Sequence, residues 1–269
     1  MTQTSSAEVY SSRLNRLRSV MTEEAVDLTL LSVGPDLPYF IGYEARPSER
    51  LTMLVVRPDD DPLLFMPRLE VPKVGDVPVE IVAWDETTDP LEAVGLMASS
   101  ANRIAIGDHT WSMFLVELLR VKSDVDWLSS SRLTAPLRIA KDETELGLIR
   151  QAAEVVDRVL ARIPGEVEFG GRSETEVASH LLAMTVAEGS DVAAHCIVGA
   201  GPNGASPHHD PGPNVIASGD LVVCDFGGRV GGYHSDVTRT FSVGEPEPFA
   251  LEVHGVVEAA NRAGRAAVS

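Results

Sequence analysis

The chain has 269 residues, of which 44% are hydrophobic and 23% are charged. This balance is typical of a folded protein, and the length suits one large domain or two ordinary ones. The 40 acidic and 22 basic residues leave a formal net charge of −18, which repels phosphate backbones and anionic lipid. We therefore expect neither a nucleic-acid-binding protein nor a membrane-surface protein.

The sequence also indicates where the protein resides. The N-terminal segment lacks the apolar core of a signal peptide, and no run of residues is apolar enough to span a membrane. The two cysteines, Cys196 and Cys224, lie in apolar runs without CxxC spacing. They indicate buried free thiols in a reducing compartment. We therefore expect a soluble cytoplasmic protein.

The first half of the chain alternates helical and strand patterns. Residues 8–21 carry apolar side chains at helical spacing, which predicts an N-terminal helix. Short apolar runs typical of buried strands then cover residues 28–33, 51–56, 63–66, 79–84 and 103–106. A helix is expected over residues 111–120 and a short strand over 125–128. This alternation predicts an α/β architecture.

A serine-rich stretch separates this half from the next. Residues 129–136 are the best candidate for a linker. They divide the chain into a first domain, residues 1–134, and a second, residues 135–269. The second domain ends in another expected helix that starts at Pro248.

Two capping boxes mark long helices in the second domain. Asp142 and Glu145 have the required spacing, and so do Ser173 and Glu176. The apolar stripe after the first box is expected to stop at Pro164, because proline cannot continue a helix. The helix after the second box is expected to end close to the next glycine.

A glycine-rich segment then predicts a β-hairpin. Residues 221–226 and 233–243 read as strands, and residues 227–232 contain four glycines that favour a tight reversal. Placing the turn at the centre of the hairpin puts Asp225 directly opposite Asp236. A bulge in the turn would shift this pairing by one residue.

Two facing carboxylates need compensation. They repel each other and pay a desolvation cost among apolar strands. One must stay protonated, pair with a base such as Arg239, or share a divalent cation with the other. Carboxylates suit Mn²⁺, Mg²⁺, Co²⁺ or Zn²⁺, and two such ions ~3.5–4 Å apart would activate a water for hydrolysis. The alternative is a pair of solvent-facing aspartates beside an exposed turn. Thr238 shares the expected face and would hydrogen-bond a ligand carboxylate.

Of the five histidines upstream of this hairpin, the three nearest to it in the sequence are the candidates for a functional role. His208 follows a loop of small residues, where it would bind a substrate carboxylate or stabilise a tetrahedral intermediate. From spacing alone, an ordinary exposed loop histidine is the better explanation. His209 is expected to face solvent. His195, at the edge of an apolar run, is expected to be a core histidine.

Taken together, these motifs resemble a known family. The segments Pro207-His208-His209, Gly219-Asp220-Leu221, Asp225-Phe226-Gly227 and residues 232–241 resemble the Xaa-Pro dipeptidase (prolidase) and aminopeptidase P branch of the pita-bread metallopeptidases. The match is specific because it joins several elements at fixed spacing, including an eleven-residue gap between the two aspartates. The resemblance implies a creatinase-type N-terminal domain plus an incomplete pita-bread α+β catalytic domain.

The resemblance also implies a chemistry. It assigns Asp225 and Asp236 as ligands of two divalent ions, usually Mn²⁺, with Co²⁺ or Zn²⁺ as alternatives, and His208 as a pocket histidine that does not bind metal. The implied activity is metal-dependent hydrolysis of Xaa-Pro bonds in dipeptides and short peptides, and the implied assembly is a homodimer. The family's remaining ligands, a histidine and two glutamates, belong to later motifs that the 269 residues do not contain. We therefore expect a fragment that is inactive by itself, with a naturally shortened, inactive protein as the alternative.

Two rival functions remain open. One is a metal-free amidinohydrolase of the creatinase type, which would not need the Asp225 and Asp236 pair. The other is a non-catalytic peptide-binding module of the same fold. Metal analysis of the purified protein separates the metallopeptidase from both.

Overall fold

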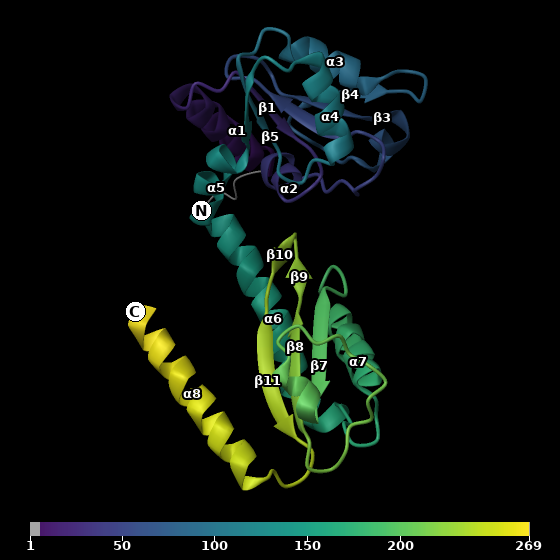
Figure 1. Cartoon of the computed structure of the whole chain (residues 1–269), viewed down its shortest axis with the longest axis vertical. Coiled ribbons are helices and arrows are strands. Elements are labelled where there is room, and N and C mark those ends of the chain that lie inside the picture. Colours follow the sequence, from purple (N-terminus) through teal and green to yellow (C-terminus); the bar gives the residue numbers. More distant parts are fainter. Residues whose placement is uncertain (1–5, 269) are drawn as a thin grey trace. The chain divides into compact units, whose positions relative to one another are not determined.

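The computed structural model describes residues 6–268. The chain divides into two compact units, Met1–Ala140 and Lys141–Ser269, which we call the N-terminal and C-terminal units (Figure 1). Among the helices of the described residues, none combines the length and apolar character needed to cross a bilayer.

The N-terminal unit is built on a six-stranded sheet. Its strands are β1 (Leu28–Leu31), β2 (Met53–Val56), β3 (Leu63–Pro67), β4 (Glu80–Trp84), β5 (Arg103–Ile106) and β6 (Asp126–Ser129). Their order is β4-β3-β2-β1-β5-β6, with β2 antiparallel to both neighbours and the other pairs parallel. The central strand β1 is buried along its whole length, since helices cover both faces of the sheet.

Helices form the outer layers of this unit. They are α1 (Ser6–Glu23), α2 (Asp36–Ile41), α3 (Pro90–Ala98), α4 (Ser112–Val121), α5 (Ser131–Ile139) and the 3₁₀ helix η1 (Arg68–Lys73). One core cluster includes Leu17, Phe40 and Leu133 from α1, α2 and α5. A second cluster includes Val94 and Phe114 from α3 and α4. The two clusters confirm the expected α/β architecture.

The expected linker at residues 129–136 is wrong. These residues form the last position of β6 and most of α5. Leu133 and Leu137, one helical turn apart, are buried, and the Tyr39 hydroxyl donates a hydrogen bond of 2.9 Å to the Leu137 carbonyl. The serines look like a linker in the sequence, but the leucines at helical spacing anchor the segment to the core. The division between the units falls after Ala140.

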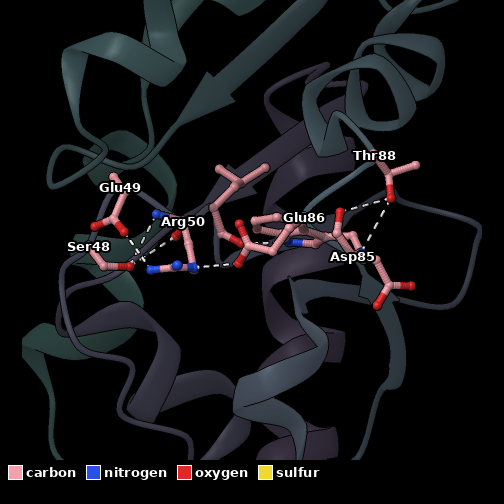
Figure 2. A network of polar contacts seen from close by, with 8 residues as sticks. Ser48, Glu49, Arg50, Asp85, Glu86 and Thr88 are labelled. Carbon is pink, nitrogen blue, oxygen red and sulfur yellow. Dashed lines mark hydrogen bonds and ion pairs between the residues drawn. The ribbon is translucent and has the colours of Figure 1, made fainter.

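A polar network ties two loops of the N-terminal unit together. Figure 2 shows Arg50 between Glu49 and Glu86, with its Nε atom 2.7 Å from a Glu86 carboxylate oxygen. Nearby, the Thr88 hydroxyl donates to the Asp85 carbonyl at 2.9 Å. Because these side chains are largely exposed, we expect the network to contribute little to stability.

The C-terminal unit combines two long helices with an antiparallel sheet. Its elements are α6 (Glu143–Glu166), α7 (Glu174–Ala187), β7 (His195–Ala200), η2 (Gly201–Ala205), β8 (Leu221–Gly227), β9 (Arg229–Val230), β10 (Tyr233–His234), β11 (Val237–Ser242) and α8 (Pro248–Val268). The main sheet has the order β11-β8-β7, and β9 pairs with β10 beyond it (Figure 1). Helix α8 buries none of its described residues.

Both predicted capping boxes are confirmed. The Asp142 side chain accepts from the Glu145 amide at the start of α6, and Ser173 accepts from Glu176 at the start of α7. Helix α6 does not stop at Pro164, however. It continues to Glu166 because a proline in the last turn removes a single intrahelical hydrogen bond.

The main sheet has one covered face and one more open face. Along β8, Val222, Cys224 and Phe226 are buried in a core cluster that includes residues of α6 and α7. Alternate residues of a strand point to opposite faces, so Asp225 lies on the face away from these helices. We call this second surface the open face.

The hairpin register differs from the prediction. Gly231 and Gly232 form a two-residue turn with φ values of +56° and +84°, as a tight hairpin of this kind requires. This turn pairs Asp225 with Thr238, so the predicted direct pairing with Asp236 is wrong by two residues. A shift of two keeps every side chain on its face. Asp225 and Asp236 therefore become diagonal neighbours on the open face.

Candidate metal centre

Three side chains that can bind a metal ion converge on the open face. Asp225 lies in β8, Asp236 in the segment just before β11, and His195 at the start of β7. Strand pairing places His195 beside Gly227. On the other side of β8, the register on either side of Asp236 places it opposite the same glycine. His195 and Asp236 thus flank Gly227, and Asp225 lies two residues along the strand.

The three side chains lie close together. One ligand atom from each of His195, Asp225 and Asp236 lies within 4.8 Å of the others. His195 Nε2 is 3.7 Å from Asp236 Oδ1, and the two side chains are 42% and 73% exposed. The prediction of a core histidine at His195 is therefore wrong. The imidazole belongs to a partly open polar cluster.

Gly227 creates the space that the cluster occupies. A Cβ atom at this position would collide with the Ser235 carbonyl oxygen and with the His195 ring. A side chain at residue 227 would therefore displace the imidazole from the carboxylates. The glycine acts here through its missing side chain, which lets a ring lie over the strand backbone.

Asp225 is the residue of the site whose negative charge is least favourable. Its Oδ1 atom is buried and, among the described residues, has no hydrogen-bond partner. Burial raises the pKa of Asp225, and the neighbouring Asp236 raises it further. Thr238, directly opposite on β11, and His195 act in the other direction. A divalent cation would favour the ionised carboxylate against both effects, so this donor set fits one.

The two thiols do not contribute to this centre. Cys196 and Cys224 belong to the core cluster on the covered face of the sheet. Burial raises the pKa of Cys196 to about 12 and raises that of Cys224 as well. Neutral, inward-facing thiols are poor metal ligands. Both cysteines are free, as predicted, although Cys196 is only half-buried.

The loop after β7 is organised by a buried carboxylate. Glu174, the first residue of α7, is fully buried and sits at the centre of a hydrogen-bond network. Its side chain accepts from groups of β7 and of the loop that follows. The donors are the Ala200 amide (2.9 Å), Asn203 Nδ2 (2.9 Å), the Gly212 amide (3.1 Å) and Asn214 Nδ2 (3.2 Å). This network ties the loop to the N-terminus of α7.

His209 completes this network. Its Nε2 atom lies 2.8 Å from a Glu174 carboxylate oxygen, and its side chain is only 19% exposed. The prediction that His209 faces solvent is therefore wrong. The adjacent His208 is exposed and lies outside the His195 cluster. Anchoring one histidine leaves its neighbour on the surface of the loop.

The hydrogen bonds also set the charge of Glu174. Burial by itself would raise the pKa of this carboxyl group. The donors from Ala200, His209, Asn203 and Gly212 outweigh burial and lower the pKa to about 2. Glu174 is therefore ionised at neutral pH, and its charge is stabilised by a shell of fixed donors.

The sequence analysis singled out two of the three clustered side chains. The predicted hairpin drew attention to Asp225 and Asp236, and the family resemblance assigned them as metal ligands. His195 was missed because its position depends on the pairing of β7 with β8, and nothing in the intervening 20 residues specifies that register. Glu174 was also missed, since a glutamate in the first turn of a helix is normally an exposed, dipole-stabilising residue.

The sequence matches two family models. Residues 13–140 match the creatinase/prolidase N-terminal domain, and residues 147–269 match metallopeptidase family M24. Among curated proteins, the chain is 35% identical over 264 residues to the "Probable dipeptidase PepE" of Mycobacterium tuberculosis, covering 96% of this chain and 70% of that protein.

Solved structures agree with these matches. Dipeptidase PepE from Mycobacterium ulcerans is 31% identical with a TM-score of 0.87, covering 97% of this chain and 71% of that one. The prolidase from Thermococcus sibiricus is 28% identical with a TM-score of 0.89, covering 94% and 71%. The fold is thus a creatinase-type N-terminal domain followed by residues of the pita-bread fold, and the chain belongs to metallopeptidase family M24.

Proposed function

We propose that this protein is a metal-dependent peptidase that hydrolyses Xaa-Pro bonds in dipeptides and short peptides. The main support is the geometry of Asp225 and Asp236, which share the open face, with one buried Asp225 oxygen lacking a hydrogen-bond partner among the described residues. Relatives named as dipeptidases and prolidases support the same substrate class.

In this proposal Asp225 and Asp236 hold two divalent ions, which we propose to be Mn²⁺. Bound there, the ions would polarise the scissile carbonyl and supply an activated water. Thr238 orients the Asp225 carboxylate from the opposite strand. His208, exposed on the loop after η2, orients the substrate by binding the carboxylate or carbonyl oxygen of the substrate. Glu174 keeps that loop in place.

The experiment is a peptidase assay on the full-length protein. Protein loaded with Mn²⁺ is incubated with Ala-Pro and, as a matched substrate, with Ala-Ala, and the release of free amino acids is measured. We expect hydrolysis of Ala-Pro in strong preference to Ala-Ala. Asp225→Asn should abolish it, whereas His180→Asn, on the exposed surface of α7, should not.

Two results would count against the proposal. Failure to hydrolyse any Xaa-Pro dipeptide at saturating Mn²⁺, Co²⁺ or Zn²⁺ refutes the assigned activity. Binding of such peptides without turnover would instead indicate a peptide-binding module. Equal hydrolysis of Ala-Pro and Ala-Ala would leave a metal peptidase but remove the proline specificity.

A further inference from the structure

The third member of the cluster, His195, has no role in the proposed function so far. It is the first residue of β7, two positions before Ile197, which pairs with Asp225. The imidazole shares the open face with both aspartates. Any polar side chain would tolerate the solvent on this face. Solvent exposure therefore does not explain why an imidazole lies beside two carboxylates.

A simple ion pair does not explain the cluster either. The distance of 3.7 Å between His195 Nε2 and Asp236 Oδ1 exceeds that of a hydrogen bond. Such a pair would also leave the buried Oδ1 of Asp225 without a partner. A cation placed among the three side chains satisfies all of them at once.

The geometry permits one ion to contact all three groups. An ion ~2.1 Å from each ligand atom requires those atoms to be within ~4.2 Å of one another. They already lie within 4.8 Å. His195 and Asp236 are both substantially exposed, so small side-chain rotations close the difference. Gly227, between them, leaves the space for this movement.

We propose that His195 is a third protein ligand at the Asp225 and Asp236 centre and strengthens its binding of cations that accept imidazole nitrogen. This inference rests on the proposed metal-binding role of the two aspartates. An all-carboxylate site suits Mg²⁺ and Ca²⁺, whereas an imidazole adds affinity for Zn²⁺ and Co²⁺. His195 thus adds a nitrogen donor to the two carboxylates of this chain.

The test measures metal binding and needs no turnover. The chain is titrated with Co²⁺, Zn²⁺ and Mg²⁺ by calorimetry, and Co²⁺ binding is followed by visible absorption. We expect His195→Asn to weaken Co²⁺ and Zn²⁺ binding by at least roughly tenfold and to leave Mg²⁺ binding unchanged. His180→Asn is the matched control and should behave as wild type.

A second measurement uses the unaltered chain. In NMR spectra, substoichiometric Mn²⁺ should broaden the imidazole signals of His195 before those of His208 and His180. This experiment is independent of whether a substitution changes folding. Broadening of His208 first would overturn the assignment of His195 as the ligand.

The outcomes separate the two proposals. Loss of binding in Asp225→Asn together with unchanged Co²⁺ affinity in His195→Asn overturns the role of His195 and leaves the proposed metallopeptidase intact. Unchanged affinity in both variants removes the metal-binding role of the aspartates, and with it both proposals. A wild-type chain that binds none of these ions shows that the three side chains do not form a sufficient site, which also overturns the His195 inference.

Discussion

Replacing Glu174 with glutamine tests how the histidine loop is held. Glutamine keeps the shape of the side chain but removes the charge. Its NH₂ group cannot accept the hydrogen bonds that one carboxylate oxygen of Glu174 accepts. Lowering the carboxyl pKa from 4.5 to about 2 contributes about 3 kcal/mol at neutral pH, since each tenfold change in ionisation is worth ~1.4 kcal/mol. We therefore expect Glu174→Gln to destabilise the loop and α7 by about 3 kcal/mol.

The pH dependence has a defined sign. Because the folded-state pKa lies below the unfolded one, the stabilisation is complete above about pH 4.5 and is lost as the pH falls towards 2. The difference in the free energy of unfolding between wild type and Glu174→Gln should therefore be constant near neutral pH and should become smaller below pH 4.5. A difference that grows on acidification would contradict this reasoning.

Hydrogen exchange measures the effect locally. The amides of Ala200 and Gly212, which donate to Glu174, should lose protection in the variant. All three tryptophans lie in the N-terminal unit, so the urea transition of tryptophan fluorescence serves as an internal control and should not move. Glu168→Gln, an exposed neighbour, is the matched variant and should exchange as wild type. Equal protection in Glu174→Gln and wild type would refute the anchoring role.

Three further predictions concern the C-terminal unit. Asp142→Ala removes the cap of α6 and should cost ~1 kcal/mol, measured by urea unfolding monitored by circular dichroism. Phe226→Ala empties a fully buried position and should cost ~3–5 kcal/mol in the same assay, with a smaller loss counting against close packing there. Asp225→Asn should stabilise the chain in EDTA at pH 7, because burial and Asp236 raise the pKa of this carboxyl and so disfavour its ionised form. Added Mn²⁺ should make wild type the more stable of the two, because the ion stabilises wild type only.

Local sequence determined many of the elements of this protein. Capping boxes at Asp142 and Ser173 give the starts of α6 and α7, because capping involves groups within three residues of each other. Strand β5 coincides with its predicted range, since a short apolar run is typical of a buried strand. Such features depend on neighbours in the chain and can be read without the fold.

Tertiary structure decided what those elements bring together. The hairpin register depended on which two glycines adopt positive φ, and four glycines in six residues left that choice open. His195 joined the aspartates only through the pairing of β7 with β8. Glu174 became a buried hub only because a loop 26 to 40 residues later folds over it. Contacts across such separations follow from packing, and no local pattern encodes them.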